Sequence, residues 1–108
     1  MYNYLCTVDR VIDGDTVDVI VDYGFYLKQK QRIRLLHVDT PERGEVDYTT
    51  ATNLLKKLTK TAAKRDPEGR LALTSFKTGK YGRWLGVLSS VDHIVDINGQ
   101  LSEQWPND

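Results

Sequence analysis

The stretch that decides the fold covers residues 16–38 and reads TVDVIVDYGFYLKQKQRIRLLHV. In its first half, valines at 17, 19 and 21 alternate with Thr16, Asp18, Ile20 and Asp22. A period of two residues is typical of a half-buried β-strand, so residues 16–23 are predicted to form one. Gly24 interrupts the pattern, and residues 29–38 predict the strand that follows.

The rest of the chain extends this pattern in both directions. Upstream, a segment rich in β-branched and aromatic residues ends at Asp13-Gly14-Asp15, which has the chemistry of a turn. Downstream, Leu54, Leu55 and Leu58 have helical spacing. The predicted elements are strands over 4–12, 16–23 and 29–38, a helix over 49–64, and strands over 70–76 and 84–89. After Ile97, Asn98-Gly99 indicates a turn, and residues 101–105 indicate a single helical turn.

Three strands, a helix and two strands form an order that fits a small barrel of the α+β class. The five-stranded OB-fold is such a barrel, with its helix inserted after strand three, and it often binds oligonucleotides. The length of 108 residues predicts a single domain over 1–108.

Composition argues against a disordered chain, a disulfide-bonded protein and a His/Cys zinc site. Hydrophobic residues make up 40% and charged residues 28%, which is an ordinary globular balance. Fifteen basic and fifteen acidic residues cancel, so bulk charge gives no support for nucleic-acid binding. Cys6 is the single cysteine and cannot form an internal disulfide, and a buried position is predicted for it. His37 and His93 lie far apart in the sequence, and no His/Cys cluster has zinc-ligand spacing.

The first eight residues lack the basic and apolar regions of a secretion signal. No stretch approaches the roughly 18 apolar residues of a membrane span. We therefore expect no membrane partner, and a cytoplasmic location if the chain is complete. If a secretion signal had already been removed from this chain, its compartment would be unknown.

Two acidic turns are candidates for a metal site. One contains Asp13 and Asp15, and the other contains Asp39 and Glu42 after the third strand. Ca²⁺ prefers carboxylate and carbonyl oxygens, which two neighbouring turns can supply. The alternative is that these are ordinary turns, because Asp favours turns for its own hydrogen bonding.

Two arginines are candidates for binding phosphate. Arg34 lies inside the third strand, on the face opposite Ile33 and Leu35, and Arg83 follows a Gly-rich basic turn. A guanidinium group can bind two phosphate oxygens at once. The alternative is an arginine paired with a carboxylate at the rim of the barrel. A metal, a carboxylate and arginines together are the parts needed for phosphodiester hydrolysis.

Three segments resemble motifs of the staphylococcal nuclease (thermonuclease) family. They read VIDGDT at 11–16, IRLLHVDTPE at 33–42 and KYGR at 80–83, in the family's order and with similar spacing. The similarity covers roughly residues 4–101 and is closest to short bacterial and phage members.

The resemblance implies an OB barrel and a role for each matching residue. The metal ligands for Ca²⁺ would be Asp15, Asp39 and the backbone carbonyl of Thr40. Arg34 and Arg83 would bind the scissile phosphate, and Lys80 and Tyr81 would contact a neighbouring one. Glu42 would act as the general base or would order water at the metal.

The implied activity is Ca²⁺-dependent endonuclease cleavage of DNA or RNA that breaks the bond to the 5′ oxygen and leaves 3′-phosphate ends. Longer members carry substrate-bracketing aromatic residues beyond the last position of this chain, so weak substrate affinity is expected here. The loop at 23–26, or a second subunit, would be the substitute aromatic surface.

Two other interpretations stay open. A non-catalytic OB-fold module would bind nucleic acid or protein without hydrolysis, although acidic residues beside a polyanion repel it unless a cation intervenes. A structural domain with inert acidic turns would show no stabilisation by Ca²⁺. The sequence leaves the choice between DNA and RNA open, and also the choice between monomer and dimer.

Overall fold

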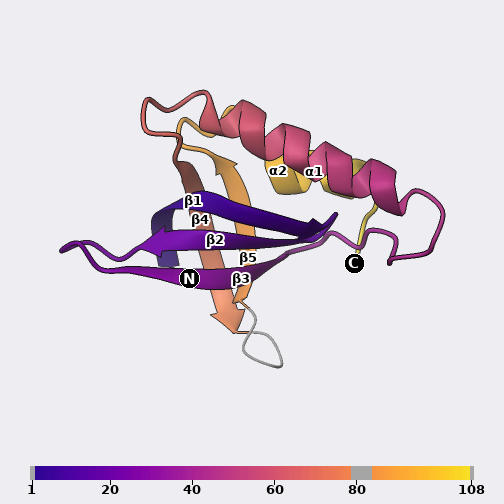
Figure 1. Cartoon of the computed structure of the whole chain (residues 1–108), viewed down its shortest axis with the longest axis horizontal. Coiled ribbons are helices and arrows are strands. Elements are labelled where there is room, and N and C mark those ends of the chain that lie inside the picture. Colours follow the sequence, from indigo (N-terminus) through magenta and orange to yellow (C-terminus); the bar gives the residue numbers. More distant parts are fainter. Residues whose placement is uncertain (1, 79–83, 108) are drawn as a thin grey trace.

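The computed structural model describes residues 2–78 and 84–107. Five strands and two helices follow one another in this part of the chain (Figure 1). In chain order they are β1 (Tyr2–Asp13), β2 (Thr16–Asp22), β3 (Lys28–Leu35), α1 (Tyr48–Ala63), β4 (Leu71–Thr78), β5 (Trp84–Ser90) and α2 (Ile97–Gln104).

The strands close into a barrel in the order β1-β2-β3-β5-β4, and β4 pairs with β1. All pairs are antiparallel except β3 with β5. This closed five-stranded barrel with a helix after the third strand confirms the predicted OB-fold class. The alternating valines of β2 are fully buried in its core, as the period of two predicted.

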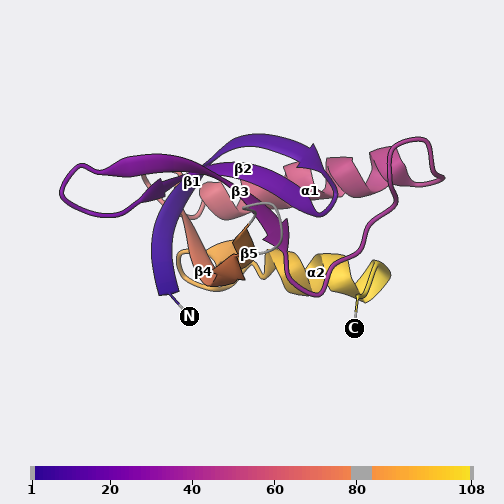
Figure 2. The same cartoon turned by 90° about the horizontal axis from the view of Figure 1, so that it is seen from below.

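Helix α1 runs along one side of the barrel, with α2 beside it (Figures 1 and 2). Its buried face includes Leu55, Leu58 and Ala62, which explains the helical spacing of apolar residues in the sequence. Neither helix in the described part of the chain is long and apolar enough to cross a membrane. Cys6 is 1% exposed, and its burial raises the pKa of the thiol to about 12, which keeps it protonated.

Two predictions were clearly wrong, a strand end and a turn, whereas the ends of most other predicted elements differ from the observed ones by one or two residues. The third strand ends at Leu35 and not at residue 38, because His37 takes a left-handed conformation with φ of 64°. Asn98-Gly99 lies inside α2 and not in a turn. The cause is Asp96, whose side chain accepts a hydrogen bond from the Gly99 amide at 3.0 Å and caps the start of the helix.

The turn before β4 depends on the ionised carboxylate of Asp66. This carboxylate accepts hydrogen bonds from the Arg70 amide at 3.0 Å and from Arg70 Nε at 2.9 Å. The Arg70 side chain is the main reason why the pKa of Asp66 falls to about 2. A lowered pKa stabilises the fold above the unfolded-state value of 3.8, and this contribution disappears as pH falls toward 2.

We therefore expect Asp66→Asn to melt below the wild type at pH 7 and to approach it near pH 2. Thermal unfolding at pH 7, 4 and 2.5 measures this difference. Glu103→Gln, an exposed change on α2, is the control and should follow the wild type throughout. A deficit of Asp66→Asn that stays constant down to pH 2.5 would contradict the electrostatic explanation.

Candidate functional site

The first acidic turn, between β1 and β2, packs against the loop after β3. A Cβ atom built on Gly14 would lie 2.7 Å from the side-chain oxygen of Thr40 and 2.8 Å from the Cβ of Ala51. Only glycine permits so close an approach. The next residue, Asp15, accepts hydrogen bonds from the Thr16 hydroxyl at 3.0 Å and from the Thr40 amide at 3.3 Å. The glycine therefore brings the Asp15 carboxylate to the second acidic loop.

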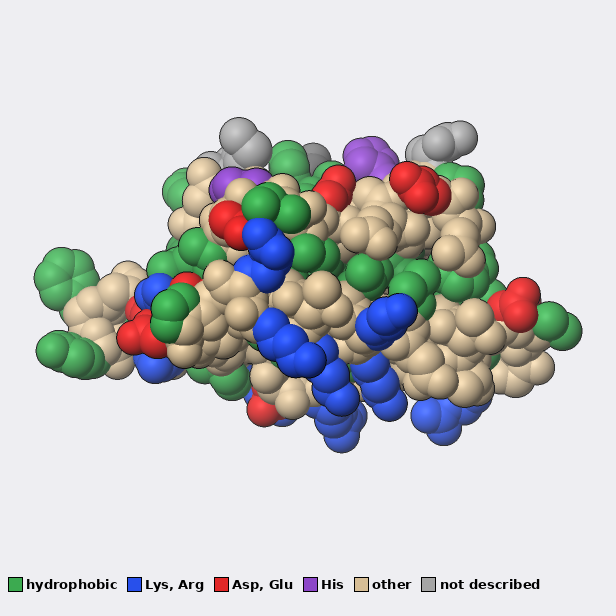
Figure 3. Space-filling view, turned by 90° about the horizontal axis from the view of Figure 1, so that it is seen from above, with side chains coloured by type: hydrophobic (Ala, Val, Ile, Leu, Met, Phe, Trp, Pro, Cys, Tyr) green, Lys and Arg blue, Asp and Glu red, His purple; other side chains and the backbone are tan. Residues whose placement is uncertain are grey.

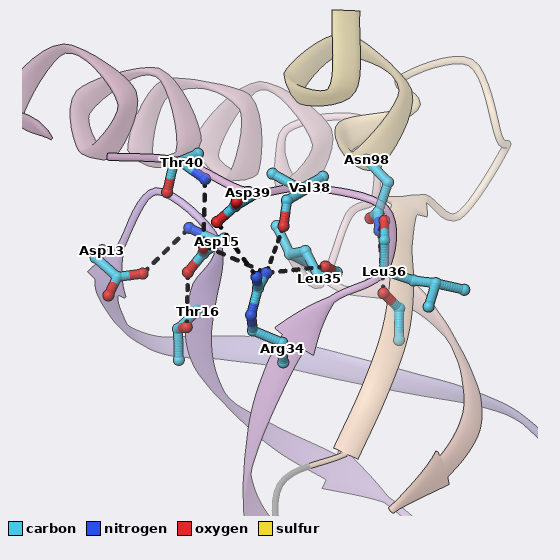
Figure 4. A network of polar contacts seen from close by, with 11 residues as sticks. Asp13, Asp15, Thr16, Arg34, Leu35, Leu36, Val38, Asp39, Thr40 and Asn98 are labelled. Carbon is cyan, nitrogen blue, oxygen red and sulfur yellow. Dashed lines mark hydrogen bonds and ion pairs between the residues drawn. The ribbon is translucent and has the colours of Figure 1, made fainter. Parts of the chain in front are cut away.

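Arg34 lies at the end of β3 and connects the two acidic turns (Figure 4). Its Nη1 lies 3.3 Å from Oδ2 of Asp15, and its Nη2 lies 3.8 Å from Oδ1 of Asp39. Nη1 also donates to the carbonyl oxygens of Val38 and Leu35, at 2.5 and 3.2 Å. The arginine is thus paired with carboxylates at the barrel rim and is also held in a fixed orientation.

The second acidic loop lines an open depression of about 650 Å³, whose walls include Asp39, Thr40, Glu42 and Trp105. The side chain of Asp39 is 65% exposed, so it faces solvent, unlike Asp15 at 13%. Glu42 is exposed, and its backbone amide donates to Oε1 of Glu45 at 2.7 Å, which holds the loop in a tight turn. The structure therefore brings Asp15, Arg34, Asp39 and Thr40 together, with Glu42 on the wall of the same depression.

Residues near the C-terminus fix this loop in place, and sequence reasoning missed them. Asn98 is buried, and its side-chain nitrogen donates to the Leu36 and Gly86 carbonyls at 3.0 Å each (Figure 4). The Asp39 amide donates to the Trp105 carbonyl at 2.9 Å. The signal that could have found this anchor was Asp96 three residues before Gly99, a helix-capping pattern.

The first acidic turn holds two carboxyl groups close together. Burial, followed by the hydrogen bond and negative charge of Asp15, raises the pKa of Asp13 to about 6. Crowded carboxyl groups of this kind lose their mutual repulsion when a cation joins them. The described residues contain no group of three His, Cys, Asp or Glu side chains positioned for a metal. A metal here would therefore rely on two carboxylates and a backbone carbonyl.

The donor chemistry fits a hard cation such as Ca²⁺. Carboxylate and carbonyl oxygens are its preferred ligands, and Asp15, Asp39 and Thr40 offer these. The Thr40 hydroxyl is buried, and the part of the chain that the structure describes gives it no hydrogen-bond partner. A buried oxygen of this kind fits a neighbouring ion or a water molecule. The predicted phosphate contacts Lys80, Tyr81 and Arg83 lie outside the described residues.

Comparisons with known proteins identify similar chains. A micrococcal nuclease from Shigella flexneri is 35% identical over 81 residues, which cover 75% of this chain and 40% of that protein. An uncharacterized endonuclease from Escherichia coli O157:H7 is 33% identical over 85 residues, which cover 79% of this chain and 48% of that endonuclease. Protein ParB from Escherichia coli is 37% identical over 100 residues, which cover 92% of this chain and 45% of that protein. The chain spans less than half the length of these relatives, and no protein-family model matches it.

Proposed function

This chain belongs to the staphylococcal nuclease-like family, and on that premise we propose that it is a nuclease that hydrolyses phosphodiester bonds of DNA or RNA with Ca²⁺ as its cofactor. One observation carries the proposal. The carboxylates of Asp15 and Asp39, from separate turns, converge on Arg34, which two backbone carbonyls hold in a fixed orientation. A module that only bound nucleic acid would gain nothing from acidic groups at this point.

In the proposed reaction, water attacks the phosphorus atom and the bond to the 5′ oxygen breaks, which leaves a 3′-phosphate. Glu42 takes a proton from the attacking water. The electron pair of the broken bond goes to the 5′ oxygen, which takes up a proton from solvent and leaves as a hydroxyl group. Arg34, together with Arg83, stabilises negative charge on the other phosphate oxygens. Bound Ca²⁺ would be held by Asp15, Asp39 and the Thr40 carbonyl, and would neutralise the charge of the phosphate.

The direct test is hydrolysis of plasmid and of heat-denatured DNA with Ca²⁺ or with EDTA. We expect cleavage with Ca²⁺, none with EDTA, and products whose 3′ ends carry phosphate. Cleavage that persists in EDTA would remove the metal from the proposal. A protein that binds DNA but cleaves neither substrate with Ca²⁺ would be a binding module instead.

Ca²⁺ should also stabilise the fold when no substrate is present. Few protein ligands imply weak binding, with a dissociation constant on the order of 10⁻⁴–10⁻³ M. At about 10 mM Ca²⁺ this corresponds to about 1.4–2.7 kcal/mol of stabilisation. The melting temperature of a chain of this size should then rise by at least about 5 °C.

The variant for this measurement is Asp39→Asn, which removes one proposed ligand from an exposed position. We expect it to lose most of the Ca²⁺-induced shift. Asp92→Asn is the matched control, because Asp92 pairs with Arg65 away from the site and should keep the shift. An equal shift in both variants would show that Ca²⁺ binds elsewhere.

A further inference from the structure

The hairpin between β2 and β3 ends in a turn that its own sequence disfavours. The Leu27 amide donates to the Gly24 carbonyl at 2.9 Å, and the two central residues, Phe25 and Tyr26, have φ values of 53° and 64°. Positive φ at both central positions defines a type I′ turn, which usually contains Asn-Gly. Bulky L-residues are strained in this conformation. The turn therefore keeps two aromatic residues where smaller residues would cost less.

These aromatic side chains point into solvent. Phe25 is 94% exposed and Tyr26 is 101% exposed, and Leu27 beside them is 61% exposed. Figure 3 shows hydrophobic side chains projecting from the end of the molecule where this hairpin lies, at the left. They add nothing to the core, so their strain is not offset by burial within the chain. Strained residues of this kind are found at sites that contact a ligand.

A row of cationic side chains leads from the hairpin to the candidate site. Lys28, Lys30, Arg32 and Arg34 occupy alternate positions of β3, so they share one face of the strand. Lys30 and Arg32 are 60% and 49% exposed, and both lie near Asp18, which is 4% exposed. The nearer partner of Lys30 is Asp9, which lies 3.1 Å away and is 39% exposed. Arg32 Nε lies 2.9 Å from Oδ1 of Asp18, and this hydrogen bond holds the pKa of Asp18 below its usual value. The charged groups of Lys30 and Arg32 therefore reach solvent, above the buried carboxylate of Asp18 and beside the exposed one of Asp9.

We propose that a single strand of nucleic acid runs along this face of β3, from the scissile phosphate at Arg34 to the hairpin, where its bases stack on Phe25 and Tyr26. The inference rests on the proposed nuclease function. Lys28 and Arg34 lie six positions apart along the strand, so the face is about 20 Å long. At the roughly 3.4 Å per nucleotide of a helically stacked strand, that length corresponds to about six nucleotides, and a more extended strand covers it with fewer. The cations follow the phosphates, while the rings offer stacking surfaces that accept any base.

The charge of the row favours a nucleic acid over the other partners that an aromatic tip could take. A protein-binding tip would need no cationic row directed toward Arg34. A membrane anchor would insert the tip but would leave the row along β3 unused over most of its length. The polymer that the candidate site is proposed to cleave accounts for both features.

The test is binding of fluorescent oligothymidylates of four and sixteen nucleotides, measured by anisotropy in EDTA so that cleavage does not interfere. The wild type should bind the sixteen-mer more tightly than the four-mer. In the double variant Phe25→Asn/Tyr26→Gly, the ratio of the two affinities should fall about tenfold, within the range expected for loss of base stacking. Its melting temperature should equal or exceed that of the wild type, because these residues suit the turn.

Ile94→Asn is the matched control, since Ile94 is a 66% exposed hydrophobic residue between β5 and α2. It should keep the wild-type ratio. An unchanged ratio in the hairpin variant would overturn the proposal, and so would hairpin-dependent binding to phosphatidylglycerol vesicles without an effect on oligonucleotides. Cleavage of the four-mer with Ca²⁺ is tested separately. Its absence would count against the nuclease function and not against the binding surface.

Discussion

Glu42→Gln should lower kcat by about 10²- to 10⁴-fold, the contribution expected of a general base. Glu42 lines the same depression as Asp39 and Thr40, and its side chain is exposed where water can reach it. Glutamine keeps the size and the polarity of the side chain but cannot accept the proton. The fold should be unaffected, because the turn is held by the Glu42 backbone amide and the Glu45 carboxylate.

Single-turnover cleavage of a labelled oligonucleotide in Ca²⁺ measures this effect on the chemical step. Glu103→Gln is the control, because it makes the same chemical change on an exposed position of α2. A Glu42→Gln protein with activity within a few-fold of the wild type would exclude Glu42 as the base. Restoration of activity at high pH would instead indicate that hydroxide replaces the base, which agrees with the assignment.

Arg34→Lys should lower kcat/KM by about 10²- to 10³-fold although the charge is kept, as for the loss of a fixed donor to the transition state. The guanidinium is oriented because one nitrogen donates to the carbonyls of Leu35 and Val38, which leaves other donors for phosphate. An ammonium group is a single point charge, so it cannot occupy both places. The variant should therefore lose most of its turnover.

Arg65→Lys is the matched control, because Arg65 also pairs with a carboxylate, at 2.8 Å from Asp92, but lies away from the site. Melting temperatures separate a lost contact to phosphate from a damaged fold. Full activity of Arg34→Lys would place the phosphate contact elsewhere. If Arg34→Lys lost much of its stability together with its activity, the main role of Arg34 would be to stabilise the loop after β3.

Much of the fold could be predicted because its signals are local. The valines of β2 alternate with a period of two, and the leucines of α1 follow a helical period, so each element is readable from its own residues. The first turn of α2 was missed, although a helical turn was predicted over 101–105, because Asn98-Gly99 has the chemistry of a turn. The cap at Asp96 and the burial of Asn98 between β5 and the loop after β3 override that local preference.

The site was predictable in its residue types and less so in its geometry. Asp15, Arg34 and Asp39 stood out in the sequence, and the structure brings them together. Nothing in the sequence indicated that Arg34 would be held by two backbone carbonyls, because backbone contacts depend on the path of the loop after β3. The same holds for the Trp105 carbonyl, whose bond to the Asp39 amide joins distant parts of the chain.

The buried Asn98 side chain has a consequence for the order in which the protein forms. Asp15 and Thr40 are 25 residues apart, whereas Asn98 and Leu36 are 62 residues apart. During synthesis from the N-terminus, the acidic turns can meet well before the segment that immobilises them has left the ribosome. The loop can be held in place only after α2 has been made, because Asn98 lies inside that helix. A nascent chain therefore contains all five barrel strands before it contains the helix that completes the site.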